Sequence, residues 1–152
     1  MSFKQRLKQN LINGPGWRTH RKIVVFESDD WGSIRTPSLS ALESLKKKGL
    51  PVQDCQYMMN DALESPGDLD RLFEVLHEHQ DSQGNPPKFT ANTIVANPDF
   101  EKIRESKFEA YRFEPFTDTY KRHTATAATF QAFQTGIGKG LFWPQLHGRE
   151  HL

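Results

Sequence analysis

The chain has 152 residues, and its 20 Lys and Arg residues nearly balance 19 Asp and Glu residues, for a net charge of +1. This balance excludes a chain-wide basic field, so we expect no nucleic-acid partner. The 11 Phe residues are too many for a disordered chain. The longest apolar run, Ile23–Phe26, is too short for a membrane span, and the N-terminus lacks a signal-peptide pattern, so a cytoplasmic location is expected.

The N-terminal segment, residues 1–21, is predicted to form a basic helix and a linker. Phe3, Leu7 and Leu11 recur at helical spacing, and six Lys and Arg residues occur up to Lys22 without any acid. Such a helix could lie on a membrane surface or on a partner. We favour a helix packed over one end of the domain with its basic face in water, because one short basic face binds weakly by itself.

The remaining residues, 22–152, are predicted to form one α/β domain. Short apolar runs rich in β-branched or aromatic residues predict strands at 22–27, 88–95 and 141–146. Apolar residues at helical spacing, with capping residues and glycines at the ends, predict helices at about 37–48, 68–79, 97–103 and 124–137. Residues 106–122 have no clear pattern. Strands that alternate with helices indicate a parallel sheet with flanking helices.

Two adjacent carboxylates, Asp29 and Asp30, follow the first predicted strand. Adjacent carboxylates repel each other, and a cleft that holds both usually needs a cation or a shared proton. Trp31 beside them could form the wall of a pocket, and Gly32 permits an unusual turn. The alternative is an ordinary polar loop in which one Asp caps the next helix.

Two histidines, His147 and His151, follow the third predicted strand at a spacing of four residues. On a helical turn this spacing puts both imidazoles on one side, within reach of one metal ion. The alternative is a pair of surface histidines. Because the carboxyl ends of parallel strands lie at one edge of the sheet, one Asp and the two histidines could meet there as a three-ligand metal site.

Phe26–Gly32 followed by His147–His151 resembles the first two motifs of the polysaccharide deacetylases, and Phe89–Thr93 resembles a strand of that family. The resemblance implies a distorted (β/α)7, TIM-like barrel, of which this chain would supply the N-terminal part. It implies a metal-dependent hydrolase that removes acetyl groups from a carbohydrate or another acylated substrate by cleaving an amide or ester.

The resemblance also assigns roles to the site residues. Asp29 would be the general base, while Asp30, His147 and His151 would bind a divalent metal ion, with Zn²⁺ as the first choice. The family's general acid comes from a later strand, beyond the last residue of this chain, so we expect little or no activity from the chain alone. An incomplete sheet would also leave an open strand edge, which favours self-association.

Two other functions compete with a deacetylase. The segment His147–His151 fits the H-x-x-E-H motif of inverted zinc proteases, in which Glu150 would be the general base. That motif lies within a helix and leaves Asp29 and Asp30 without a role. The second alternative is a non-catalytic remnant or interaction module that keeps the start of the barrel without its reaction. Metal binding that depends on His147 favours the deacetylase, and absence of bound metal favours the remnant.

Overall fold

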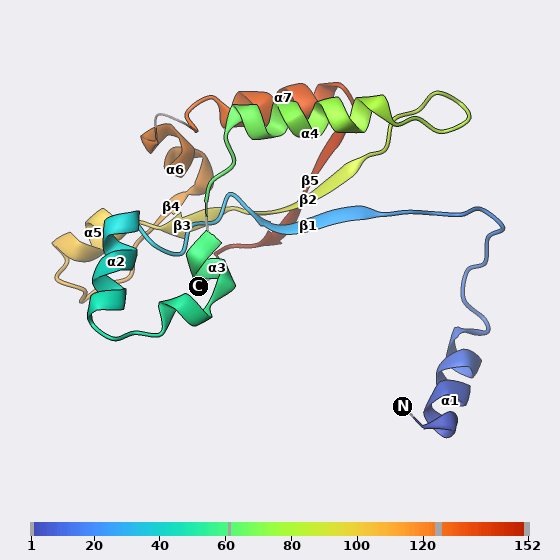
Figure 1. Cartoon of the computed structure of the whole chain (residues 1–152), viewed down its shortest axis with the longest axis horizontal. Coiled ribbons are helices and arrows are strands. Elements are labelled where there is room, and N and C mark those ends of the chain that lie inside the picture. The colour runs from blue at the N-terminus through green and yellow to red at the C-terminus, as the bar shows by residue number, and fades with distance from the viewer. Residues whose placement is uncertain (1, 61, 124–125, 151–152) are drawn as a thin grey trace.

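A parallel sheet of three strands, in the order β1-β2-β5, forms the centre of the molecule (Figure 1). The computed structural model describes residues 2–60, 62–123 and 126–150. The strands are β1 (Phe26–Trp31), β2 (Phe89–Ile94) and β5 (Phe142–Gly148). The predicted α/β class with parallel strands and flanking helices is therefore confirmed. Within the described residues the sheet is open, with β1 and β5 at its edges, and self-association through these edges stays a prediction.

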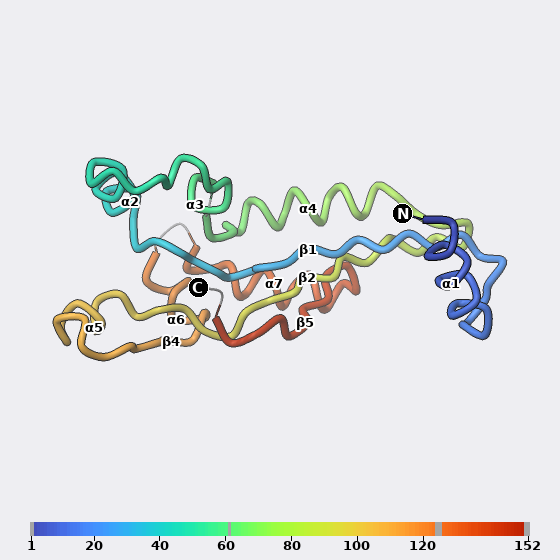
Figure 2. The backbone as a smooth tube through the Cα atoms, turned by 90° about the horizontal axis from the view of Figure 1, so that it is seen from below, coloured from blue at the N-terminus to red at the C-terminus, as the bar shows by residue number. Residues whose placement is uncertain are grey.

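Helices α4 (Pro66–Glu78) and α7 (Thr129–Gly138) pack against each other and cover one face of the sheet (Figures 1 and 2). Helix α4 begins at the N-cap Ser65, whose hydroxyl accepts a hydrogen bond from the backbone N–H of Asp68. The helix therefore begins two residues before the predicted start at Asp68, whose side chain completes a capping box with Ser65. In α7, a Cβ atom at Gly136 would overlap the ring of Phe73, so glycine allows the two helices to approach closely.

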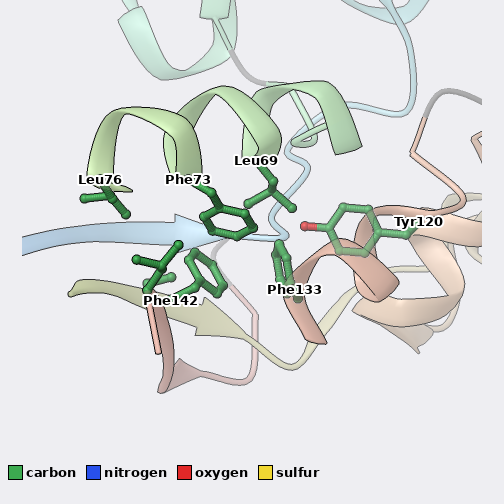
Figure 3. Close-up of a cluster of buried hydrophobic side chains, with 8 residues drawn as sticks. Leu69, Phe73, Leu76, Tyr120, Phe133 and Phe142 are labelled. Atoms are coloured by element: carbon green, nitrogen blue, oxygen red, sulfur yellow. The ribbon is translucent and has the colours of Figure 1, made fainter. Parts of the chain in front are cut away.

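The hydrophobic core lies between these two helices and the sheet, and Figure 3 shows its main side chains. The ring of Phe142 in β5 lies 4.9 Å from that of Phe133 and 5.9 Å from that of Phe73, measured between centroids. Tilted and edge-on aromatic pairs of this kind each contribute about 0.5–1.5 kcal/mol beyond the burial of their surface. The buried core residues are Leu69, Phe73, Leu76, Ala91, Tyr120, Phe133, Leu141 and Phe142.

The smaller elements gather beyond the carboxyl ends of the strands (Figure 1). They are α2 (Leu39–Lys47), η1 (Val52–Asp54), α3 (Gln56–Asn60), β3 (Ala96–Pro98), α5 (Phe100–Glu105), β4 (Phe113–Pro115) and α6 (Phe116–Arg122). Strands β3 and β4 pair in an antiparallel ladder. The region 106–122, in which the sequence predicts no element, thus holds β4 and α6.

Asn97 in β3 fixes the turn that follows β1. Its amide donates to the carbonyl of Gly32 at 2.8 Å and to the hydroxyl of Thr119 at 3.1 Å, and its Oδ1 accepts from the N–H of Ile34 at 3.0 Å. The side chain is 1% exposed, so these bonds replace the water that the amide and the turn would otherwise contact. Strand β3 and helix α6 therefore hold the end of β1 in place.

Helix α1 (Phe3–Asn13) begins with a capping box formed by Ser2 and Gln5, and it lies apart from the other elements (Figures 1 and 2). The predicted helix is confirmed. All of its residues are exposed, so the expectation that it packs over one end of the domain is wrong. Among the described residues, no helix is both long enough and apolar enough to cross a membrane.

The first strand differs from the prediction for residues 22–27. It begins at Phe26, while Ile23, Val24 and Val25 ahead of it are 55%, 75% and 69% exposed. Pairing with β2 decides which residues form the strand, and β2 runs alongside only the later, more polar part. As a result, Asp29 and Asp30 lie within the strand rather than in a loop after it.

Candidate metal and acid-base site

Side chains from the two edge strands of the sheet meet at one end of it. Asp30 lies near the end of β1 and His147 near the end of β5, on either side of β2. Nε2 of His147 is 3.4 Å from Oδ1 of Asp30. The structure thus brings together a carboxylate and an imidazole that are 117 positions apart in the sequence, as the parallel arrangement predicts.

The backbone at Asp30 departs from regular strand geometry. Its φ is 65°, in the left-handed region, and the pairing register with β2 shifts between Ser28 and Trp31. Asp tolerates this conformation better than most residues, and such strained positions cluster at functional sites. The irregularity changes the direction of the Asp30 side chain at the point where the strand ends.

A guanidinium group already lies beside the Asp30 carboxylate. Nη2 of Arg35 is 2.8 Å from Oδ2 of Asp30, and the two side chains are 17% and 21% exposed. The guanidinium carbon of Arg35 also lies 5.2 Å from the centre of the Tyr57 ring. One oxygen of Asp30 therefore faces a fixed cation and the other faces His147.

Asp29 points to the face of the sheet that α4 and α7 leave uncovered. The Asn92 side chain in β2 donates to Oδ1 of Asp29 at 2.7 Å and to Oε1 of Glu27 at 2.8 Å. Asp29 itself is exposed. The two neighbouring aspartates thus have different surroundings, since an amide orients Asp29 while Arg35 and His147 flank Asp30.

Glu64 is a further candidate site residue, and no sequence pattern selects it. Its Oε1 accepts from the backbone N–H of Gly32 at 3.2 Å, and its Oε2 accepts from the hydroxyl of Tyr120. Its carbonyl oxygen accepts from the hydroxyl of Thr129 at 2.8 Å. Burial raises the pKa of the Glu64 carboxyl, and burial next to this carboxyl raises the pKa of the Tyr120 hydroxyl as well.

An open pocket of about 480 Å³ lies between the end of β1 and helix α3. Its charged residues are Asp29, Asp30, Arg35 and Glu64, so both signs of charge face the same space. The remaining lining residues are Ser28, Trp31, Gln56, Tyr57, Asn60 and Ala62. A polar ligand that carries hydroxyl or amide groups fits this lining better than an apolar one.

Trp31 lines this pocket but belongs mainly to the core. Its ring lies 5.2 Å from that of Phe142, 5.5 Å from that of Phe89 and 6.2 Å from that of Phe133, between centroids. The residue therefore connects the end of β1 to the hydrophobic face of the sheet. Its expected role as a pocket wall accounts for only part of its contacts.

The helical argument for the two histidines is wrong at His147, because β5 extends through this residue to Gly148. His151 lies outside the described residues. Among the described residues, no three His, Cys, Asp or Glu side chains form a group that could hold a metal ion. A third ligand for a metal between Asp30 and His147 must therefore come from elsewhere, and His151 stays the predicted one.

The inverted zinc-protease alternative needs His147 and Glu150 on one helix, and the strand at His147 contradicts it. Glu150 instead accepts a hydrogen bond from the Tyr111 hydroxyl at 3.0 Å and pairs with Arg149. These contacts join the Glu150 carboxylate to Tyr111 and Arg149.

Comparison with known proteins adds no family to this geometry: no protein-family model, no curated protein and no solved structure matches the chain.

Proposed function

We propose that the chain is part of a metal-dependent hydrolase similar to the polysaccharide deacetylases, which removes acetyl groups from a carbohydrate or another acylated substrate. The observation that carries the proposal is the 3.4 Å approach of Asp30 and His147 from two different strands. In this proposal the parallel sheet belongs to a distorted (β/α)7 barrel. The helices that cover one face of the sheet are compatible with the outer layer of such a barrel.

The donors fit a divalent metal ion such as Zn²⁺, although two of them are not a complete site. A carboxylate oxygen and a neutral imidazole nitrogen are both ordinary zinc ligands, and catalytic zinc sites usually have three protein ligands. Asp30 and His147 would hold the ion together with His151. A bound Zn²⁺ would supply a Lewis acid that polarises the acyl carbonyl.

The other residues of the pocket would orient the substrate and move its protons. Asp29 would accept a proton from the attacking water, with the Asn92 amide holding its carboxylate in place. Glu64 lines the same pocket, and its raised pKa keeps a proton on the carboxyl to a higher pH than on an exposed glutamate. Tyr57 and Asn60 offer a ring and an amide to a polar substrate.

A second candidate is a non-catalytic binding module, and the ion pair between Arg35 and Asp30 favours it. The guanidinium already neutralises the carboxylate at 2.8 Å, which is the charge that a metal ion would otherwise supply. In this case the pocket would bind a polar ligand without metal, and Asp30 would serve to position Arg35.

Metal analysis of the purified chain at neutral pH distinguishes the two candidates. The chain is equilibrated with Zn²⁺, freed of loose metal by gel filtration and assayed for bound zinc. The hydrolase predicts about one equivalent per chain, lost in Asp30→Ala and His147→Ala and retained in His77→Ala, a control at an exposed histidine of α4. Zinc-free wild-type protein, or zinc that remains in both site variants, contradicts the hydrolase.

A further inference from the structure

Helix α1 presents an apolar stripe that nothing in the described part of the chain covers. Phe3, Leu7 and Leu11 are 81%, 49% and 70% exposed. The helix sits at the end of an extended segment, at the amino-terminal side of the sheet and away from α3 (Figures 1 and 2). A helix of 11 residues is only marginally stable in water without packing, even with a capping box. Its stability therefore depends on a surface that receives the stripe.

Positive charge flanks the stripe on both sides. At 3.6 residues per turn, Lys4 and Lys8 lie along one border of the stripe and Arg6 lies along the other. The segment that follows adds three cations and an aromatic ring before the sheet begins: Trp17, Arg18, Arg21 and Lys22. Trp17 is 79% exposed. No acidic residue occurs from position 1 to position 22.

We propose that α1 lies in the surface of an anionic lipid bilayer, with its apolar stripe in the lipid and its cations at the head groups. A Phe and Leu stripe bordered by Lys and Arg is the pattern of helices that lie in a membrane interface. Trp favours the same interface, and clustered cations beside such a helix are attracted to anionic lipids. The lipid would thus complete the packing that the helix lacks, and this proposal does not depend on the hydrolase.

A second copy of the chain is a less suitable occupant. In a symmetric pair of α1 helices, the Lys and Arg residues that border each stripe would approach one another. The segment has no acid to neutralise them. The charge pattern of the segment therefore favours an anionic lipid surface over a second α1 helix.

Vesicle sedimentation with the full chain tests the proposal. The probes are vesicles of phosphatidylcholine alone and vesicles of phosphatidylcholine with phosphatidylglycerol. We expect roughly tenfold or greater preference for the anionic vesicles at low salt. The preference should disappear at about 1 M salt, where the screening length is about 3 Å.

Matched variants show whether α1 is responsible. Leu7→Glu, and Lys4→Glu combined with Lys8→Glu, should each reduce binding to the anionic vesicles to the level seen with neutral ones. The controls lie in α2 and at its C-cap: Leu39→Glu, at a side chain that is 80% exposed, and Lys47→Glu combined with Lys48→Glu. These controls carry the same changes of polarity and charge and should bind as the wild type does. Because α1 is exposed throughout, thermal unfolding of the α1 variants should be the same as that of the wild type.

Three results would overturn the proposal. The first is equal or absent binding of the wild type to the two kinds of vesicle. The second is binding that the α1 variants leave unchanged. The third is a dimer in solution that Leu7→Glu dissociates, without any binding to vesicles, which would make a second copy of the chain the occupant of the stripe.

Discussion

The two faces of the parallel sheet differ in what covers them and in what they hold. One face carries Phe89, Ala91 and Phe142 beneath α4 and α7, and its side chains are apolar and mostly buried. The opposite face carries Glu27 and Asn92 beside Asp29, and these residues are exposed or half-buried. Stability thus comes mainly from one face, while the groups able to do chemistry lie on the other face and at the strand ends. Changes to the covered face should therefore lower the free energy of unfolding, whereas changes at the strand ends should alter zinc binding.

The largest expected effect is on the covered face. Phe133 is 2% exposed and its ring contacts those of Trp31, Tyr120 and Phe142. Phe133→Ala should lower the free energy of unfolding by about 3–5 kcal/mol, because it removes a buried ring and leaves a cavity. Urea unfolding measures the loss.

Phe130 on the same helix provides the control for this prediction. It lies in the same predicted helix as Phe133, but it is 42% exposed. Phe130→Ala should therefore cost clearly less than Phe133→Ala. Equal losses of unfolding free energy in the two variants would show that α7 does not pack against the core mainly through the side that carries Phe133.

The next largest effect is expected at Gly32, which follows the end of β1 next to the candidate site. Its φ is 82°, and an added Cβ atom would lie 2.9 Å from Cδ2 of Phe116. Gly32→Ala should cost about 1–3 kcal/mol through backbone strain and overlap. Gly49→Ala, at a φ of 79° with no atom within 4 Å of the added Cβ, isolates the contribution of the backbone. If both variants lose the same stability, the contact with Phe116 is unimportant.

A smaller change at Arg35 should affect the site and leave the core intact. Arg35→Gln removes the positive charge next to Asp30, so zinc affinity should rise roughly tenfold, a change of about 1.4 kcal/mol. Stability should change by less than about 1 kcal/mol, since the pair is partly exposed. Zinc titration against a competing chelator measures the affinity. Weaker zinc binding in the variant would mean that Arg35 supports the site rather than competing for it.

The smallest expected effect is a dependence of stability on pH at Glu64. Burial raises the pKa of this carboxyl above its ordinary value of 4.5, so the folded chain holds the proton more tightly than the unfolded chain. Its contribution to the free energy of unfolding should therefore fall as the pH rises from 4.5 through the raised pKa, and stay low above it.

Urea unfolding at a series of pH values checks this prediction with two variants. Glu64→Gln should remove the decline, because the amide cannot ionise. Glu74→Gln, at an exposed position of α4, should keep it. A decline that persists in Glu64→Gln would assign it to another group.

The covered face was largely predictable from the sequence, because helix packing is encoded locally. Leu69, Phe73 and Leu76 recur at helical spacing, and all three are buried as that spacing predicts. The apolar strand at 141–146 likewise begins where Phe142 enters the core. In both places a local pattern and the tertiary packing agree.

The site was only partly predictable, because its contacts join distant positions. The local β propensity of Ile23–Val25 predicts the wrong start for the first strand, since pairing with β2 selects a later segment. Glu64 lies in an irregular stretch, and its role depends on Gly32 and Tyr120, which are 32 and 56 positions away. Parallel topology predicted that one of the two aspartates would approach His147, and the resemblance to the deacetylases selected Asp30. The ion pair with Arg35 had no sequence signal.

Thermal unfolding with and without Zn²⁺ tests the central claim most directly. A metal that binds the folded chain at Asp30 and His147 stabilises it, by about 2.7 kcal/mol when free metal is a hundred times its dissociation constant. Zinc should therefore raise the Tm of the wild type, a chelator should reverse the increase, and Asp30→Ala and His147→Ala should show none. A wild-type Tm that does not respond to zinc, or an equal increase in the two variants, would contradict the proposed metal site.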